Sequence, residues 1–280
     1  MTISGQACVA GVMGWPVGHS RSPRLHNFWL AEYGIDGAYV PLPVRPGNLG
    51  TALRALPALG FAGVNLTVPH KEAALPLMDA LDGTAKRVGA VNTVVVRADG
   101  GLEGRNTDGF GFIGNLRAGV SGWDAAAGPA VVIGAGGAAR AVVVALMDHA
   151  APEIRVVNRT RVRAEALAAG FGRPVTALPW DARAGALDGA ALLVNTTSLG
   201  MTGQPPLDLA LEALPADAVV TDAVYAPLET ALLAAARARG NPVVDGLGML
   251  LHQARPAFAA WFGRDPEVTD GLRAHVLAEG

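Results

Sequence analysis

The sequence predicts an α/β protein with two domains, one of which is built on a doubly wound parallel sheet. Three observations lead to this fold class. The chain has 280 residues, which exceeds one typical domain and is enough for two buried cores. It is 51% hydrophobic but only 5% aromatic, a composition typical of Val-, Ala- and Leu-rich strands covered by helices. Strand-like runs also alternate with helix-length segments, which indicates parallel sheets.

In the N-terminal part, short apolar runs predict strands and the longer segments between them predict helices. The expected strands cover residues 8–14, 37–43, 60–67 and 90–96. The expected helices cover residues 23–33, 47–57, 69–80 and 109–118. The turn-rich segment SGWDAAAGP (121–129) is the clearest junction in the linear pattern.

After this junction the pattern predicts a six-stranded doubly wound sheet. Its expected strands cover residues 130–134, 153–158, 173–178, 191–195, 218–222 and 241–245. The expected helices between them cover residues 137–149, 161–169 and 227–239. The tail from residue 248 onward is expected to be helical, with Trp261 and Phe262 as apolar anchors.

The charge, the cysteine count and the N-terminus exclude several classes of protein. A formal net charge of −2 gives no overall positive charge that would indicate a polyanionic partner, so we expect no nucleic-acid partner. The one cysteine, Cys8, rules out an intramolecular disulfide and offers no zinc site, so we expect no metal. The N-terminus lacks the positive region of a signal peptide, and Pro129, Arg140 and several glycines interrupt the apolar run 125–147. We therefore expect a cytoplasmic protein without a membrane segment.

The segment VVIGAGGAARAVVVAL predicts a dinucleotide-binding turn of the Rossmann type. It places Gly134, Gly136 and Ala139 in the G-x-G-x-x-G/A spacing, after a strand and at the start of a helix. Gly134 permits the tight turn, Gly136 lets the backbone approach a pyrophosphate, and Ala139 keeps the helix close to the sheet. The N–H groups at the helix start, at Gly137 and Ala138, favour an anionic ligand. A purely structural glycine-rich turn is the alternative.

The end of the next strand indicates which dinucleotide is bound. An NAD site has an acidic residue there for the ribose 2′-hydroxyl, whereas this chain has Asn158, Arg159, Thr160 and Arg163. Arginine binds phosphate oxygens through a planar fork of donors. The sequence therefore predicts NADP(H) as cofactor, with a solvated basic helix start as the alternative. The chain contains no Gly-Lys pair, so it has no P-loop.

Polar clusters lie at the ends of the apolar strands in the N-terminal part: GHSRSP (18–23), NLTVPHK (65–71), AVNT (90–93) and GRNTDGFG (104–111). Ser20 and Ser22 lie on one side of an extended segment, although Ser22 could instead cap the next helix. Lys71 falls in the first turn of the helix that Pro69 is expected to open, where a cation is mildly unfavourable. Asp108 is either functional or a turn residue in NTDG. No histidine pattern completes a catalytic triad or a metal site, so we exclude serine hydrolases and metalloenzymes.

These clusters, with GAGGAAR, NRTRVR, NTTSLGM, DAVY and DGLGMLLHQA, occur in the order and spacing of the shikimate dehydrogenase family. The chain resembles that family from about residue 11 to residue 262. The resemblance implies reversible hydride transfer between NADPH and 3-dehydroshikimate, a step toward chorismate and the aromatic amino acids. It also implies a discontinuous substrate domain, residues 1–108 and 246–280, and an inserted NADP domain, residues 109–245, with a cleft between them. One departure is Thr230-Ala231, where the family usually has Thr-Pro, and we expect it to alter a helix start.

The resemblance implies roles for individual residues as well. Lys71 and Asp108 match the catalytic pair, and Ser20 and Ser22 match serines that bind the carboxylate of shikimate. Matches to residues that bind the substrate hydroxyls, or support those that do, are Asn65, Thr67, Asn92, Asp108 and Gln253. Matches near the bound ligands are Tyr225, beside the substrate, and Gly246, beside the nicotinamide. The resemblance leaves open whether Lys71 transfers the proton or stabilises the developing alkoxide.

Three other functions remain as alternatives. A quinate/shikimate dehydrogenase would use a broader range of substrates or NAD, but the serine pair and the arginine loop are intact. A non-catalytic module that senses shikimate or NADP would have no need of Lys71 and Asp108. A methylene-tetrahydrofolate dehydrogenase would not explain the serine pair or NTDG. We expect a monomer or a homodimer that acts on a small-molecule substrate.

Overall fold

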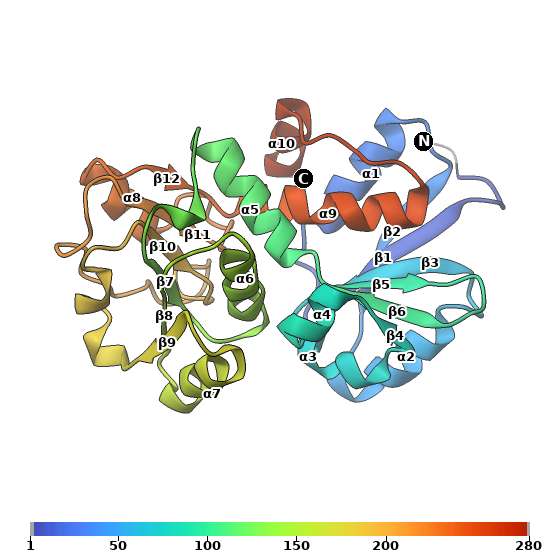
Figure 1. Ribbon diagram of the computed structural model, residues 1–280. Coiled ribbons are helices and arrows are strands. Elements are labelled where there is room, and N and C mark those ends of the chain that lie inside the picture. Colours follow the sequence, from blue (N-terminus) through green and yellow to red (C-terminus); the bar gives the residue numbers. More distant parts are fainter. Residues whose placement is uncertain (1–2, 279–280) are drawn as a thin grey trace. The chain divides into compact units, whose positions relative to one another are not determined.

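The computed structural model describes residues 3–278 and divides the chain into two units (Figure 1). Unit 1 contains the residues up to Thr107 together with those from Leu250 onward, and unit 2 contains Asp108–Met249. Unit 1 is therefore discontinuous in the sequence. The limits fall one and four residues from those that the resemblance implied. The segment 121–129, which the linear pattern presents as a junction, lies inside unit 2.

Unit 1 contains a six-stranded sheet with the order β2-β1-β3-β5-β6-β4. The strands are β1 (Cys8–Gly14), β2 (Gly37–Pro43), β3 (Phe61–Leu66), β4 (Ala80–Leu81), β5 (Thr93–Val96) and β6 (Leu102–Arg105). β1 pairs in parallel with β2 and β3, whereas β5 is antiparallel to both β3 and β6. The sheet is therefore mixed: the expectation of parallel strands is confirmed for β1, β2 and β3 and wrong for β5. The strands β4 and β6 were not expected at all.

Helices cover both faces of this sheet. They are α1 (Ser22–Glu32), α2 (Leu49–Ala55), α3 (His70–Ala73), α4 (Gly83–Val88), α9 (Leu247–Phe262) and α10 (Asp270–Leu277). Figure 1 shows α2, α3 and α4 on one face and α1 and α9 on the other. Leu53 of α2 packs with Val64 on the first face, and Trp261 of α9 packs with Val12 on the second. Trp261 also donates a hydrogen bond from Nε1 to the Val94 carbonyl at 3.0 Å.

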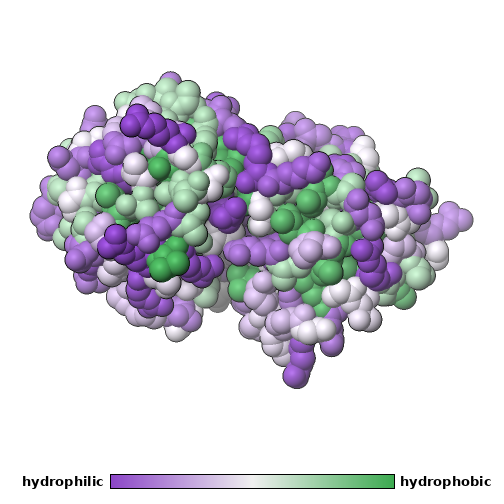
Figure 2. Space-filling model, turned by 60° about the horizontal axis from the view of Figure 1, so that its bottom comes forward, coloured by the Kyte–Doolittle hydropathy of each residue, from purple (hydrophilic) through white to green (hydrophobic). Residues whose placement is uncertain are grey.

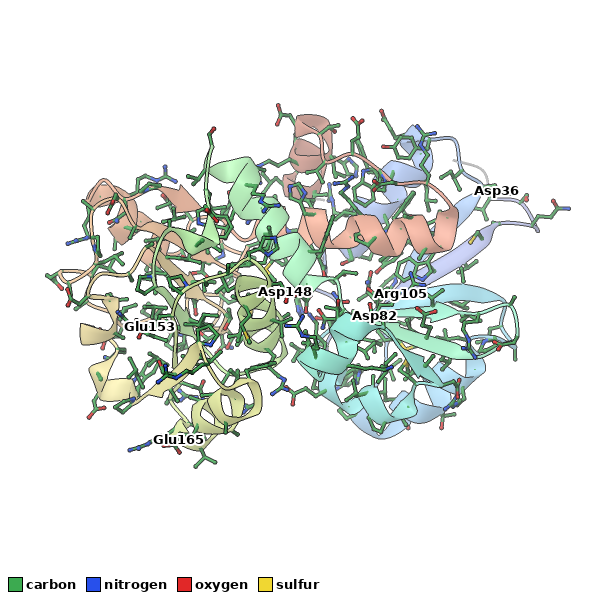
Figure 3. All side chains as sticks on the ribbon, viewed as in Figure 1. Asp36, Asp82, Arg105, Asp148, Glu153 and Glu165 are labelled. Carbon is green, nitrogen blue, oxygen red and sulfur yellow. The ribbon has the colours of Figure 1, made fainter. Side chains whose placement is uncertain are left out.

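The helix expected over residues 69–80 was wrong. Pro69 lies before α3 as its cap residue and not in its first turn, and α3 is a single turn. Pro76 lies in the short 3₁₀ segment Leu75–Leu77 that follows. The α-helix does not continue through this segment, because proline lacks the N–H and its ring clashes with the preceding turn. After β4 the chain enters α4, where the Asp82 side chain accepts a hydrogen bond from the Ala85 N–H (Figure 3).

Unit 2 contains a six-stranded sheet with the order β12-β11-β10-β7-β8-β9. The strands are β7 (Ala130–Ile133), β8 (Ile154–Val157), β9 (Val175–Leu178), β10 (Leu192–Asn195), β11 (Val219–Asp222) and β12 (Val243–Val244). The helices are α5 (Asp108–Gly119), α6 (Gly137–Asp148), α7 (Arg161–Phe171) and α8 (Ala231–Ala238). All of these strand pairs are parallel. The predicted doubly wound sheet is therefore confirmed.

The apolar run 125–147 forms a 3₁₀ turn, β7 and most of α6. Within residues 3–278, no helix has both the length and the apolar character that crossing a membrane requires. Polar side chains cover much of the face shown in Figure 2, with smaller apolar areas between them. Among the residues that the structure describes, the large apolar side chains that are exposed are Ile3, Trp15, Leu59, Val68, Phe110 and Val162.

Candidate functional site

One edge of the unit 1 sheet gathers most of the residues that were expected to bind substrate. β1, β3 and β6 end at this edge, and β5 begins there because it is antiparallel to β3 and β6. The segment 90–93 therefore lies beside the segments that follow β3 and β6. The antiparallel course of β5, which the sequence did not predict, brings these polar clusters together.

Asn65 lies near the end of β3 and connects three strands. Its Oδ1 accepts a hydrogen bond from Tyr39 Oη at 2.6 Å. Its Nδ2 donates to the Asn92 carbonyl and to Thr93 Oγ1, both at 3.1 Å. Burial raises the pKa of Tyr39 well above its usual range, so the Tyr39 hydroxyl remains a donor. Both polar groups of the Asn65 amide thus serve the framework of the site, and Tyr39 and Thr93 are members that the sequence did not reveal.

Asn92 connects β5 to the end of β6 and to α9. Its Oδ1 accepts from Thr93 Oγ1 at 3.0 Å and from the Thr107 N–H at 2.9 Å. Its Nδ2 donates to Thr107 Oγ1 at 3.0 Å and to Gln253 Oε1 at 2.8 Å. The structure therefore brings Asn92 together with Gln253, which lies 161 residues later in the chain.

The serine pair lies at the start of α1. Ser20 Oγ accepts a hydrogen bond from the Ser22 N–H at 3.3 Å, and the Ser22 side chain hydrogen-bonds Tyr39. Arg21, not Ser22, occupies the cap position of α1, and it makes no side-chain cap bond. The alternative that Ser22 caps this helix was therefore wrong. Ser22 is instead connected through Tyr39 to Asn65.

Thr67 follows β3 directly, and its N–H donates to the Met13 carbonyl at 3.0 Å. A Cβ at Gly14 would lie 2.5 Å from Thr67 Cγ2. Only glycine at this position allows β1 to approach the Thr67 side chain so closely. Thr67 is half-buried beside the end of β1.

Lys71 and Asp108 lie in different units. Lys71 is half-buried in α3 of unit 1, and its carbonyl accepts from the Val91 N–H at 2.8 Å. Asp108 is the first residue of α5 and of unit 2, and only 2% of it is exposed. It follows Thr107 directly, and Thr107 is bonded to Asn92. His70, to which we assign no function, is buried with Nε2 at 2.8 Å from the Val44 carbonyl oxygen.

The turn between β7 and α6 has the conformation that the glycine fingerprint predicts. Gly134 has φ = 121°, and a Cβ there would collide with Thr196 Oγ1. Gly136 caps α6 without a side-chain hydrogen bond, and a Cβ there would meet nothing within 4 Å. Gly137 and Ala138 begin α6, so the N–H groups of the first turn are not covered by a capping side chain. An anion at this helix start would receive hydrogen bonds from them.

The segment after β8 is basic and largely exposed. Asn158 Nδ2 donates to the Thr160 carbonyl at 2.9 Å, which shapes the turn into α7. Thr160 occupies the cap position of α7 without a side-chain cap bond. Arg159 and Arg163 are both exposed. A basic segment at the end of the second strand fits a phosphate better than a ribose 2′-hydroxyl.

Two further residues join the loops that follow β10 and β11, and the sequence reading did not single them out. Asn195 Nδ2 donates to Asp222 Oδ1 at 3.0 Å. Asp222 Oδ1 also accepts from the Val224 N–H at 2.9 Å, and its Oδ2 accepts from Thr230 Oγ1 at 2.8 Å. Burial raises the pKa of Asp222 to about 6. Asn and Asp at the ends of two apolar strands are the signal that could have revealed them.

Tyr225 and Gly246 lie beside this connection. Tyr225 is half-buried in the loop that follows β11. A Cβ at Gly246 would lie 2.5 Å from the backbone carbonyl oxygen of Val224 and 2.6 Å from that of Asp222. Gly246 is therefore required for the close packing of this backbone against the loop that carries Tyr225.

Three family models match successive parts of the chain. The shikimate dehydrogenase substrate binding domain matches residues 12–94, and shikimate / quinate 5-dehydrogenase matches residues 121–200. The shikimate 5′-dehydrogenase C-terminal domain matches residues 246–274. The matched segments together extend over more than half of the chain.

Relatives and solved structures match almost the whole length. The shikimate dehydrogenase (NADP(+)) of Paramagnetospirillum magneticum is 65% identical over 276 residues, which cover 99% of this chain and all of the relative. Shikimate 5-dehydrogenase of Thermus thermophilus, solved with NADP(H) and shikimate, is 41% identical with a TM-score of 0.86, covering 96% of this chain and 98% of its own. Quinate dehydrogenase of Corynebacterium glutamicum, solved with NAD, is 34% identical with a TM-score of 0.88. The match covers 97% of this chain and 99% of the quinate dehydrogenase chain. This chain belongs to the shikimate dehydrogenase family.

Proposed function

We propose that this chain is an oxidoreductase that catalyses the reversible, NADP-dependent reduction of 3-dehydroshikimate to shikimate. The observation that carries the proposal is the 65% identity to an NADP-dependent shikimate dehydrogenase along 99% of the chain. Unit 1 is the proposed substrate domain, because its sheet edge holds Asn65, Asn92 and Gln253 in one polar network. Unit 2 is the proposed cofactor domain, because it holds the glycine turn and the basic segment.

Residues of both units fit NADP(H) and the substrate. The N–H groups at 136–138 would bind the pyrophosphate, and Arg159 with Asn158, Thr160 and Arg163 would bind the 2′-phosphate. Gly246 and Tyr225 would lie near the nicotinamide and the substrate. Ser20 and Ser22 would bind the substrate carboxylate. Thr67 and Gln253 would bind its hydroxyls, and Asn65 and Asn92 would support them.

When bound, NADPH supplies the hydride that reduces the ring carbonyl carbon of the substrate. The carbonyl oxygen then needs one proton to become the hydroxyl of shikimate. Lys71 is the proposed source of that proton or the cation that stabilises the developing alkoxide. Asp108 is its proposed catalytic partner and would also bind the neighbouring hydroxyl. In the reverse direction the same pair would accept the proton from shikimate.

Quinate and NAD are the main alternative ligands, because a quinate dehydrogenase with NAD shares the fold at a TM-score of 0.88. Two features favour shikimate and NADP. Both serines are present at the start of α1, and Arg159 stands where an NAD enzyme has an acidic residue. A module that only senses shikimate or NADP would not require Lys71 and Asp108.

The test is an absorbance assay at the nicotinamide band, with shikimate and quinate each offered NADP⁺ and NAD⁺. We expect shikimate with NADP⁺ to give the highest kcat/KM. A higher kcat/KM for quinate or with NAD⁺ would favour the broader dehydrogenase. Binding without turnover in all four combinations would favour the sensor.

Two further expectations accompany the proposal. We expect the protein in the cytoplasm, since its one cysteine suits a reducing compartment. We also expect a monomer or a homodimer, which light scattering during gel filtration distinguishes.

A further inference from the structure

Thr93 is a fully buried hydroxyl between two amides of the proposed substrate site. It is the first residue of β5 and has an exposed fraction of 0%. The sheet register pairs it with Asn65 of β3 on one side and with Arg105 of β6 on the other. Its Oγ1 lies 3.1 Å from Asn65 Nδ2 and 3.0 Å from Asn92 Oδ1.

The neighbours of Thr93 determine the direction of its hydrogen bonds. Asn65 Nδ2 faces the Asn92 carbonyl, which can only accept, and Asn65 Oδ1 faces the donor Tyr39 Oη. The Asn65 amide therefore has one orientation, and it donates to Thr93 Oγ1. A threonine hydroxyl carries a single proton. With one lone pair used by Asn65, that proton points to Asn92 Oδ1.

The orientation of Asn92 determines the direction of the hydrogen bond to Gln253 in α9. Its Oδ1 receives the Thr93 hydroxyl and the Thr107 N–H, so its Nδ2 must face Thr107 Oγ1 and Gln253 Oε1. Because Gln253 Oε1 accepts from Asn92, this contact does not use the Gln253 Nε2 group. Gln253 is thereby held with its donor end available for a substrate oxygen.

Strand formation does not by itself explain a hydroxyl at this position. Valine has nearly the same shape as threonine and an equal or higher preference for strands. It would also avoid the cost of burying a polar group. The hydroxyl is the part of the side chain that joins the two amides.

We infer that Thr93 is a positioning residue for the proposed reaction, and that its hydroxyl orients Asn92, which in turn holds Gln253 for a substrate hydroxyl. The inference rests on the proposed function, which assigns this sheet edge to shikimate. Thr93 does not itself contact the substrate in this account. It acts through Asn92, so its effect belongs to substrate binding and not to cofactor binding.

The test compares Thr93→Val, which removes the hydroxyl, with Thr93→Ser, which retains it. Thr93→Val loses both hydrogen bonds of the hydroxyl, of which the bond to Asn92 bears on the substrate. We expect the loss of this one neutral bond to raise the KM for shikimate roughly five- to tenfold. The KM for NADP⁺ should stay within about twofold, because Thr93 lies in unit 1. Thr93→Ser should restore the KM for shikimate, which a role in packing alone would not predict.

Three results would overturn the inference and leave the proposed function standing. One is an unchanged KM for shikimate in Thr93→Val, and another is a Thr93→Ser variant as impaired as Thr93→Val. If Thr93→Val does not fold, Thr93→Cys replaces it, because cysteine keeps a small side chain with only a weak donor. The third result is then a Thr93→Cys variant whose KM for shikimate is no higher than that of Thr93→Ser. Wild-type protein that does not oxidise shikimate with NADP⁺ would overturn the proposed function and this inference together.

Discussion

Asn65, Asn92 and Asp222 are buried polar side chains that connect separate elements. Each makes at least three hydrogen bonds. A buried polar group without a partner costs about 1–3 kcal/mol, so each bond fixes both the side chain and the loop that it reaches. The proposed site therefore depends on a rigid polar framework behind the residues that would touch ligands.

The sequence could reveal only part of this framework. Asn65, Asn92 and Asp108 stand out because they are polar residues at the ends of apolar strands. Tyr39 and Thr93 do not stand out, because tyrosine and threonine are ordinary strand residues. Only the folded sheet, which brings both hydroxyls within hydrogen-bond distance of Asn65, reveals their role.

Lys71 provides the most direct test at the residue scale. Replacing it by alanine removes the ammonium group that would donate the proton or stabilise the alkoxide. We expect Lys71→Ala to lower kcat by about 10²–10⁴, the usual contribution of a general acid or base, with a much smaller rise in the KM for shikimate. Steady-state kinetics with shikimate and NADP⁺ measure both quantities.

Lys86 offers a matched control, because it is the other of the two lysines in the chain. It is exposed on α4 and has no place in the proposed site. Lys86→Ala should therefore have wild-type kinetics. A Lys71→Ala enzyme with nearly normal turnover would contradict the catalytic assignment.

At the scale of elements, apolar runs predicted their strands even where the strands are short, whereas β4 and β6 lack such a run. β1 and β2 have the expected bounds, and the parallel sheet of unit 2 follows the expected order. β6 has one apolar residue followed by two charged residues and a glycine (LEGR), so no apolar run indicates a strand there. The missed signal was the Asp99-Gly100 turn, which joins β5 to β6 and closes with the Arg97 N–H donating to the Gly101 carbonyl. That turn explains why β5 and β6 are antiparallel.

The start of α8 retains its cap although Ala231 stands where the family usually has proline. Thr230 caps this helix by accepting from the Leu233 N–H. Ala231 occupies the first helical position, which proline also tolerates. The change therefore leaves the cap in place, and Thr230 still donates to Asp222 at 2.8 Å.

Asp222 ties the loops after β10 and β11 to α8, and its ionisation should weaken the fold. Burial raises its pKa from 3.8 to about 6. The unfolded chain loses this proton near pH 4, so from about pH 4 to pH 6 the folded state binds more protons. The free energy of unfolding therefore falls as pH rises through this range, by about 3 kcal/mol at most. Asp222→Asn should remove that fall, as urea unfolding at several pH values would measure.

Asparagine suits this position, because it keeps one oxygen for Asn195 and Val224 and the Thr230 hydroxyl can turn to accept. Asp79→Asn is a control of opposite sign. The Leu102 N–H and the Arg54 guanidinium lower the pKa of Asp79, so its stabilising effect is present at neutral pH and lost on acidification. Relative to wild type, Asp222→Asn should gain stability as pH rises and Asp79→Asn should lose it. A wild-type pH profile for Asp222→Asn would contradict the account.

At the scale of the whole molecule, the discontinuity of unit 1 could not be derived from the linear pattern. Trp261 of α9 packs on the sheet of unit 1 and bonds to Val94, 167 residues earlier. Nothing in the local sequence of α9 indicates that it packs on the sheet of unit 1 and not on the sheet of unit 2, whose strands are nearer in the sequence. The resemblance to a known family implied the return of the C-terminal helices, because a family pattern carries long-range contacts that periodicity lacks.

The assignment of one ligand to each unit can be tested by hydrogen exchange in the intact protein. A ligand that binds only the folded state suppresses local opening around its site. NADP⁺ alone should therefore protect amides in segments 134–140 and 158–163, whereas shikimate alone should protect segments 18–23, 65–71 and 90–93. The strand β9 (Val175–Leu178), outside both proposed sites, serves as an internal control that neither ligand should change. Protection of 134–140 by shikimate, or of 65–71 by NADP⁺ alone, would contradict the assignment, because each ligand would then reach the backbone of the wrong unit.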